Sequence, residues 1–250
     1  MIAADNISIG YDSRSLIRDL NFELPSGSIL SIIGSNGSGK SSLIRVLNGL
    51  QEPNQGGVKW KGESLSSISP RERVRAAASL YSNFSRVEGF SVRDLVALGR
   101  TPYTDFFGRM KAKDREMVDF AMKETGISDF ADKAIRDLSD GEFRKAMLAK
   151  LLAQDTDILF LDEPTTHLDL PAAIEFASLL KKMAGRGKTV IFSTHHLALA
   201  FKMSNSVLLL DGKGEWALGD AEEIMSHELL CHFLKTDKIR VENGDLKFDL

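Results

Sequence analysis

Apolar and polar residues alternate along the start of the chain with the two-residue period of half-buried strands. Residues 7–11 follow this period, and residues 22–24 follow it again. Residues 30–33 instead form a short apolar run closed by Gly34, which is typical of a strand buried in a parallel sheet. The first third of the chain is therefore predicted to consist mainly of strands and turns.

Helical spacing dominates the middle of the chain. Residues 41–50 have the pattern of a helix, and a turn-rich stretch then leads to a short predicted strand at 58–61. From residue 91 to residue 153, apolar side chains recur mostly every three or four positions. The candidate N-caps in this region are Ser91 and either Ser139 or Asp140.

Strands return in the last third. Apolar runs at 158–161, 189–192 and 207–210 predict strands, and residues 172–183 predict a helix between the first two. Strands that alternate with helices favour a parallel sheet covered on both faces, so the expected fold class is α/β.

The C-terminal end contains a hairpin signal. An Asn-Gly turn at 243–244 would pair Val241 with Leu246 and Ile239 with Phe248, placing four apolar side chains on one face. We expect a hairpin that packs on the body of the protein, with a regulatory or contact role as the alternative.

Composition excludes several classes of protein. The 250 residues are 43% hydrophobic and 27% charged, which suits one large globular domain or two small ones. The net charge of −3 argues against wholesale wrapping of nucleic acid. Cys231 is the single cysteine, which fits a reducing compartment. No apolar run approaches the ~20 residues of a membrane span, and the N-terminal residues lack the pattern of a signal peptide.

One motif carries phosphate chemistry. Residues 34–41 read GSNGSGKS and match G-x-x-x-x-G-K-[ST], between a predicted strand and a predicted helix. Glycines allow backbone N–H groups to face the phosphates, and the helix N-terminus adds its positive end. Lys40 would reach the β- and γ-phosphates, and the Ser41 hydroxyl would ligate Mg²⁺. The candidate nucleotide-binding residues are Gly34, Ser35, Asn36, Gly37, Ser38, Gly39, Lys40, Ser41 and Ser42.

A second motif agrees with the first. The apolar run at 158–161 delivers Asp162 and Glu163 at the carboxyl end of a predicted strand. An acid in this place holds Mg²⁺ in phosphate-transferring α/β proteins. We expect Asp162 to hold the metal through water and Glu163 to polarise the attacking water. A buried strand that merely ends in a solvated acid is the alternative.

A third motif permits a family comparison. Residues 138–142 read LSDGE and resemble the LSGGQ signature of ATP-binding cassette (ABC) ATPases, and residues 11–219 resemble that family in motif order. The resemblance implies a P-loop NTPase fold with a mostly parallel core sheet, an N-terminal antiparallel β subdomain and a helical signature subdomain. It implies an ATPase domain, placed at 1–235, with the helical part inserted at about 85–155; the hairpin signal adds an extension at 236–250.

The resemblance also assigns roles. Tyr11 matches the position that stacks on adenine, Asp169 lies in the D-loop, and His195 matches the switch histidine that senses the γ-phosphate. Together with Lys40 and Glu163, His195 would be catalytic. The signature residues would bind the ATP of a second copy of the chain, so an ATP-sandwich homodimer is implied. These residues are Ser139, Asp140, Gly141 and Glu142.

Some positions depart from the family pattern. Asp140 and Glu142 replace a Gly and the Gln of the commonest signature, which would cost phosphate affinity unless the carboxylates point away or cap the helix. Asn83, or Ser82 with a one-residue gap, stands where the family has a Q-loop glutamine that contacts Mg²⁺. The expected metal-site residues are Ser41, Asp162 and Asn83. His196 stands where the family often has Asp.

The stretch 90–103 resembles ATPases of bacterial importers for iron–siderophore complexes, haem and cobalamin. In that group a groove accepts a coupling helix of a multispanning permease, which works with a substrate-binding protein; no nucleic acid is expected as partner. The expected location is peripheral, at the cytoplasmic face of the inner membrane. The groove candidates, which would otherwise be subdomain core, are Phe84, Phe90, Val92, Tyr103, Phe106 and Phe107.

The sequence thus predicts the ATP-hydrolysing subunit of a bacterial ABC importer, with an iron chelate favoured over haem or cobalamin as cargo. The alternative is a soluble ABC ATPase without a transport role, such as an iron–sulfur cluster assembly factor. A tandem-cassette factor is disfavoured by the single cassette and the absence of net positive charge.

Overall fold

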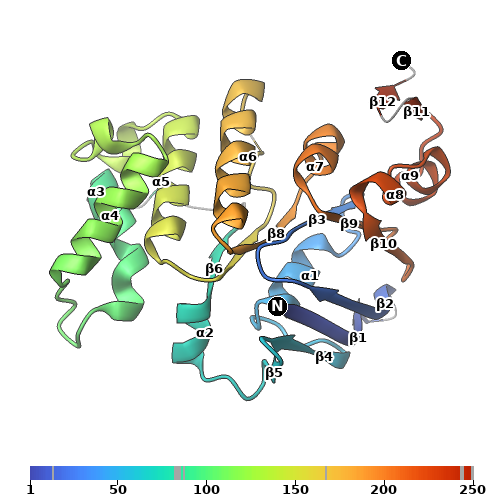
Figure 1. Ribbon diagram of the computed structural model, residues 1–250, viewed down its shortest axis with the longest axis horizontal. Helices are drawn as coiled ribbons and strands as arrows, with labels where there is room; N and C mark the ends of the chain where they lie inside the picture. Colours follow the sequence, from blue (N-terminus) through green and yellow to red (C-terminus); the bar gives the residue numbers. More distant parts are fainter. Residues whose placement is uncertain (13, 82–85, 87, 167, 243–244, 249–250) are drawn as a thin grey trace.

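The computed structural model describes residues 1–12, 14–81, 86, 88–166, 168–242 and 245–248 (Figure 1). Its strands are β1 (Ile2–Tyr11), β2 (Arg14–Leu24), β3 (Ile29–Gly34), β4 (Gln55–Trp60), β5 (Glu63–Ser64), β6 (Ala77–Leu80), β7 (Ile158–Leu161), β8 (Thr189–Ser193), β9 (Ser206–Leu210), β10 (Trp216–Asp220), β11 (Ile239–Glu242) and β12 (Asp245–Phe248). Its α-helices are α1 (Lys40–Leu47), α2 (Pro70–Ala76), α3 (Val92–Ala97), α4 (Ala112–Glu124), α5 (Asp140–Ala153), α6 (Leu170–Gly185), α7 (Leu197–Met203), α8 (Ala221–Ile224) and α9 (His227–Leu234). Three 3₁₀ helices complete the list: η1 (Leu98–Tyr103), η2 (Ser128–Phe130) and η3 (Ile135–Asp137).

A six-stranded sheet forms the centre of the molecule. Its order is β10-β9-β3-β8-β7-β6, and all neighbours are parallel except the edge strand β10. Ile158 and Phe160 of β7 face one hydrophobic core, whereas Leu159 and Leu161 face the other. Both faces of the sheet are therefore buried, which explains why its strands read as continuous apolar runs rather than as alternating ones.

A smaller antiparallel sheet covers one face. Its order is β2-β1-β4-β5, and helix α1 packs between it and the central sheet. Trp60 packs in this core and connects its layers. Its indole N–H donates to the Leu47 carbonyl (3.0 Å), and its ring stacks on Phe160. This layer is the expected N-terminal antiparallel subdomain, and it fixes the position of β1 relative to the loop before α1.

Helices α3, α4 and α5 gather on the other face, beside α6, and form the green group in Figure 1. Ser91 caps α3 and Ser139 caps α5, each in a reciprocal capping box with the third residue of its helix. The predicted N-caps are confirmed. Val92 is fully buried in this core. Its expected place in a docking groove is therefore wrong: as the first residue of α3 it packs inward.

The C-terminal elements form a third core against β9. Leu230 and Phe233 of α9 pack there with Ile239, and Val241 and Leu246 lie against the same cluster. Strands β11 and β12 pair antiparallel in the predicted register, with Val241 opposite Leu246 and Ile239 opposite Phe248. The hairpin is thus attached to the body of the protein rather than extended from it.

Several elements differ from the sequence prediction. Helix α1 begins at Lys40 and ends at Leu47, and β4 spans Gln55–Trp60 instead of 58–61. Strand β6 (Ala77–Leu80) was not predicted, because small residues in a short run give little periodic signal. In the described part of the chain, no helix is both long and apolar enough to cross a bilayer.

Candidate nucleotide site

The phosphate-loop motif lies between β3 and α1, as the sequence predicts. Gly34 ends the strand, and a Cβ there would lie 2.4 Å from Ser38 Oγ and 2.5 Å from the Leu210 carbonyl oxygen. Gly39 precedes the helix with φ of 103°, a left-handed value that favours glycine. These two positions therefore require glycine for the loop to curl over the helix N-terminus.

Lys40 lies across this loop. Its side chain is only 4% exposed, and its ammonium donates to the carbonyls of Gly34 (2.9 Å) and Ser35 (3.2 Å). Burial lowers the pKa of Lys40, and the nearby carboxylates of Glu163 and Asp162 partly oppose this shift. The ammonium also lies 3.8 Å from Glu163 Oε1. A phosphate group would complete the coordination of this buried cation.

The two acids lie where β7 ends. The Ser193 hydroxyl, at the end of β8, donates to Asp162 Oδ1 (2.6 Å) and accepts the backbone N–H of Glu163 (2.9 Å). Glu163 itself has φ of 50°, and its Oε1 lies 2.6 Å from His195 Nε2. Ser193 therefore connects both acids, and His195, which follows the end of β8, contacts Glu163 from the same side.

A cavity of about 610 Å³ connects the phosphate loop, Glu163 and the β1–β2 hairpin, whereas Asp162 and His195 are not among its lining residues. Its size suits a nucleotide-sized ligand. Tyr11 is 49% exposed at its edge, and its hydroxyl is held by Ser42 (3.0 Å) and Gln51 (3.1 Å). The cavity is lined by Tyr11, Asp12, Arg14, Leu16, Asn36, Gly37, Gly39, Lys40, Ser41, Ser42 and Glu163.

The sequence did not predict two residues that contact the candidate site. Arg14 lies opposite Tyr11 in the β1–β2 hairpin and donates from Nη2 to the carbonyl of Gly37 (3.2 Å). Ser193 lies two residues before His195. The only sequence signal for either is its nearness to a recognised motif, because each acts through a contact that depends on the fold.

The signature lies at the start of α5. Glu142 accepts the backbone N–H of Ser139 (2.7 Å) and pairs with Lys133 (3.2 Å). The hydrogen bond from the Ser139 N–H lowers the pKa of the Glu142 carboxyl, and Lys133 lowers it further by a smaller amount. Burial acts in the opposite direction but does not outweigh them. Asp140 pairs with the Arg86 guanidinium. Glu142 thus caps the helix, which was one of the two conditions for keeping phosphate affinity, whereas Asp140 is held by an ion pair with Arg86.

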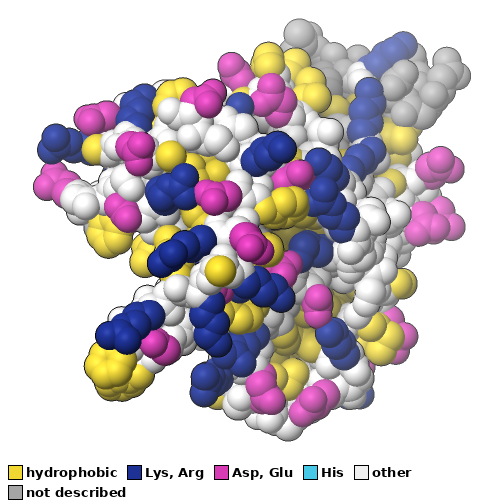
Figure 2. All heavy atoms as spheres, turned by 60° about the vertical axis from the view of Figure 1, so that its left-hand side comes forward, with side chains coloured by type: hydrophobic (Ala, Val, Ile, Leu, Met, Phe, Trp, Pro, Cys, Tyr) yellow, Lys and Arg dark blue, Asp and Glu magenta, His cyan; other side chains and the backbone are white. Residues whose placement is uncertain are grey.

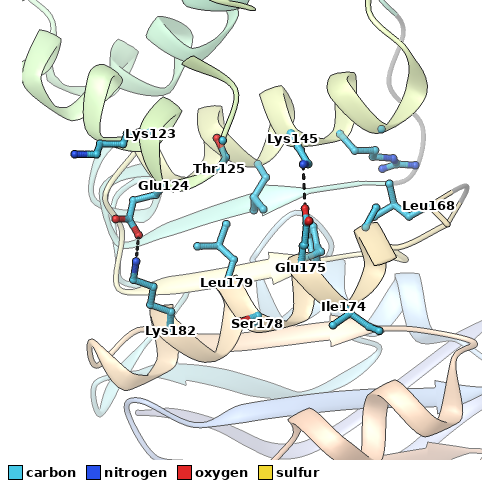
Figure 3. Close-up of a pocket in the computed structure, with 16 residues that line it drawn as sticks. Lys123, Glu124, Thr125, Lys145, Leu168, Ile174, Glu175, Ser178, Leu179 and Lys182 are labelled. Atoms are coloured by element: carbon cyan, nitrogen blue, oxygen red, sulfur yellow. Dashed lines mark ion pairs between the residues drawn. The ribbon is translucent and has the colours of Figure 1, made fainter. Parts of the chain in front are cut away.

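The signature residues line no part of the 610 Å³ cavity. Gly141 instead lines a second cavity, of about 670 Å³, between α4, α5 and α6 (Figure 3). Two ion pairs cross it, Lys145–Glu175 (3.0 Å) and Lys182–Glu124 (2.7 Å). Asp169 also lies away from the nucleotide cavity and caps α6 through the Ala172 N–H (2.9 Å). A single chain therefore does not assemble all the predicted nucleotide contacts.

The remaining predicted positions have mixed outcomes. Asn83, Ser82 and Phe84 lie outside the described residues, so the Q-loop prediction stays a prediction. Phe90 is half-buried against the helical core, and Tyr103 lies under the Arg100 guanidinium, 4.0 Å from its ring centroid. Phe106 and Phe107 are exposed. His196 directly precedes α7 and donates its backbone N–H to Thr194 Oγ1.

The residues present fit a magnesium ion. Asp162 is only 4% exposed and lies close enough to Lys40 to raise its pKa. Ser41 lines the same cavity as Lys40. Carboxylate and hydroxyl oxygens are the ligands that this hard cation prefers, and water completes its octahedron.

Comparisons with known proteins agree with this geometry. The family model described as ABC transporter matches residues 17–166. The iron(3+)-hydroxamate import ATP-binding protein FhuC of Bacillus subtilis is 32% identical over 94% of this chain and 88% of its own length. The petrobactin import ATP-binding protein FpuD of Bacillus anthracis is 36% identical over 90% of this chain and 82% of its own length.

A solved structure extends the agreement to three dimensions. An inward-facing metal-chelate type ABC transporter matches with a TM-score of 0.83 and 25% identity, over 98% of this chain and 94% of that chain. The shared fold, the family model and the extent of the two relatives all point to one conclusion. The chain belongs to the ABC transporter family, as an ATP-binding and ATP-hydrolysing member.

Proposed function

We propose that this chain is the ATP-hydrolysing subunit of a bacterial importer for an iron chelate, with haem and cobalamin as the less favoured cargoes. The observation that carries the proposal is the single cavity that unites Tyr11, the phosphate loop and Glu163. Its relatives FhuC and FpuD are named as import ATP-binding proteins for iron(3+)-hydroxamate and petrobactin, which favours the iron chelate.

The cavity divides the nucleotide among its walls. Tyr11 would stack on adenine, and residues 34–42 would surround the phosphates with backbone N–H groups and hydroxyls. The Lys40 ammonium would leave the two carbonyl oxygens and bind phosphate oxygens. This exchange is favourable because the ammonium is buried, and a charged acceptor binds a buried cation more strongly than a neutral one.

Glu163 and His195 would carry out the hydrolytic step. The carboxylate would orient and polarise the attacking water, while His195, 2.6 Å from Glu163, would donate to the γ-phosphate. Mg²⁺ would be held by Ser41 and Asp162, with Asn83 as the third expected contact, and would neutralise charge on the phosphates.

A second copy would complete the site. Ser139, Asp140, Gly141 and Glu142 lie away from the nucleotide cavity of their own chain, as does Asp169. Leu170 and Ile174, on α6 directly after Asp169, are 74% and 54% exposed, which is unfavourable in an isolated chain. A head-to-tail homodimer that encloses two ATP molecules accounts for both observations.

ATP would act through linkage. It favours the closed dimer over the open one, and this difference in binding free energy drives the conformation of the partner subunits. Those partners would be multispanning permease subunits and, indirectly, a substrate-binding protein. The chain would then lie at the cytoplasmic face of the inner membrane as a peripheral protein.

Domain organisation follows the same scheme. Residues 1–235 would form the ATPase unit, with the helical part at about 85–155 inserted into it, and residues 236–250 the hairpin extension. Helices α3, α4 and α5 share one hydrophobic core with the central sheet and α6, which supports their insertion into a single ATPase unit.

The test uses a tagged Glu163→Gln variant. It should keep ATP binding and lose hydrolysis, which would trap the closed dimer. Recovered with ATP from detergent-solubilised native membranes, it should carry a multispanning protein in matching amount, identified by mass spectrometry. Recovery only with cytosolic proteins would favour the soluble assembly factor, and normal ATP turnover would refute the role of Glu163.

A further inference from the structure

The loop between η1 and α4 carries two aromatic rings that no described residue of the chain covers. Phe106 is 97% exposed and Phe107 is 76% exposed, the highest values for large hydrophobic side chains among the described residues. The rings pack edge to face with centroids 5.6 Å apart. Two adjacent phenylalanines exposed to this degree are unfavourable in water unless a partner covers them.

The tip of this loop is braced. Asp105 Oδ1 accepts hydrogen bonds from the backbone N–H groups of Phe107 and Arg109, each with a length of 2.9 Å. Gly108, with φ of 73°, closes the turn. These bonds hold the rings away from the body, so binding through them requires little further ordering of the loop.

The base of the loop is also fixed. The buried Arg100 pairs with Asp114 (2.9 Å) and donates to the Ala153 carbonyl (2.7 Å). From the other side, Arg75 donates to the Pro102 carbonyl through two nitrogens, at 3.1 and 2.9 Å. The loop therefore extends from a rigid platform, below α4 at the lower left of Figure 1.

Exposed cations lie beside the rings and follow them in the sequence. Arg109 lies over Phe107, 5.5 Å from the ring centroid, and the side chains of Lys111, Lys113 and Arg115 are exposed next in sequence. Asp105 and Glu116 are exposed in the same stretch, so residues 105–116 expose four cations against two acids, whereas the whole chain has a net charge of −3. Figure 2 shows a hydrophobic projection at the lower left of the visible face, with Lys or Arg side chains and an acidic side chain beside it.

We propose that the loop at 104–111 is a membrane contact, in which Phe106 and Phe107 enter the headgroup boundary of an anionic phospholipid bilayer. Aromatic rings with adjacent cations suit this boundary, because the rings bury apolar area while the cations approach lipid phosphates. A convex tip of two rings is far smaller than the ~800 Å² per partner of a stable protein interface. The proposal rests on the proposed function, since a permease would bring the chain to the membrane.

The first measurement uses Phe106→Trp. Trp60 is buried and Trp216 is half-buried, so the wild-type chain supplies a constant background for the new fluorophore. With vesicles of phosphatidylethanolamine and phosphatidylglycerol (3:1), the emission should shift to the blue and be quenched by brominated lipid. Pure phosphatidylcholine vesicles should give a much smaller change.

The second measurement is co-sedimentation of the full chain with the same vesicles. The pair Phe106→Ser and Phe107→Ser should weaken binding at least tenfold. Arg109→Gln with Lys113→Gln should weaken it about 25-fold, about fivefold for each cation. Leu50→Ser, an exposed apolar position elsewhere, is the control for the rings, and thermal unfolding verifies that each variant folds.

The outcomes separate the explanations. Unchanged Phe106→Trp emission, together with equal sedimentation of all variants, would overturn the lipid contact. If vesicle binding is unchanged, but Phe106→Ser and Phe107→Ser added to the tagged Glu163→Gln chain abolish recovery of the membrane protein, the loop contacts a permease instead. Vesicle binding that depends on the rings, in a chain that recovers no membrane protein, would support the lipid contact while refuting the proposed function.

Discussion

Replacing Ser193 with alanine tests whether one buried hydroxyl positions both acids of the nucleotide site. Ser193 is fully buried at the end of β8, where it donates to Asp162 and accepts the N–H of Glu163. Alanine removes both contacts and almost no volume. The expected defect is therefore one of position and charge rather than of packing.

The magnitude follows from the two lost bonds. A hydrogen bond to a charged group contributes about 1.5–3 kcal/mol, and an unsatisfied buried N–H costs about 1–3 kcal/mol. If about 1.4–2.7 kcal/mol of this loss appears in the transition state, kcat falls about 10- to 100-fold. KM for ATP should change less than kcat, because the hydroxyl reaches the nucleotide only through Asp162 and Glu163 while the phosphate loop keeps its own contacts.

The assay compares phosphate release with binding of a fluorescent ATP analogue. Ser193→Thr keeps the hydroxyl and should recover part of the lost kcat. Ser31→Ala is the matched control: Ser31 is also fully buried, on the neighbouring strand β3, and its hydroxyl has no hydrogen-bond partner among the described residues. Full kcat in Ser193→Ala, or an equal loss in Ser31→Ala, would refute the positioning role.

Two further predictions concern stability and nucleotide binding. Asp114→Asn leaves the buried Arg100 without its charged partner and should destabilise the fold by about 3–5 kcal/mol. Burial alone would raise the pKa of Asp114, but the Lys111 N–H and Arg100 outweigh it and lower that pKa. The stabilisation is therefore complete above the ordinary aspartate pKa of about 3.9 and is lost as the pH falls through the lowered value. In thermal unfolding, the difference in the free energy of unfolding between wild type and Asp114→Asn should be constant from pH 5 to 7 and become smaller below pH 4. A difference that stays constant down to pH 3 would contradict this. Tyr11→Ala should raise the Kd for ATP about 5- to 150-fold, the range for loss of one base–aromatic stack, whereas Tyr11→Trp should keep the affinity. Equilibrium titration checks this, and an unchanged Kd in Tyr11→Ala would remove Tyr11 from the adenine site.

The parts of the fold that the sequence predicts are those with a strong local pattern. Strand β7 was predicted at its observed bounds because a four-residue apolar run is buried on both faces. The capping residues Ser91 and Ser139 also have a local signal: each lies just before a helix and has an acidic residue three positions later. Strand β6 lacks such a pattern and depends on pairing with β7.

The candidate site divides in a similar way. Lys40 and Glu163 follow from motifs, because phosphate chemistry demands those residue types in that order. Arg14 and Ser193 do not, because their roles depend on a hairpin and a strand register that bring distant backbone atoms within hydrogen-bond distance. Val92 was misplaced because an apolar residue in a helical stretch has the same sequence signature in a core as in a groove.

The back-folded position of Lys40 has a consequence for turnover. Its ammonium is nearly inaccessible to water, yet it donates to two carbonyls of its own loop. When product leaves, the loop therefore supplies substitute acceptors, and no buried cation is left without a partner. Each cycle can then begin from an ordered empty site, so exchange of ADP for ATP would need no local unfolding of the loop.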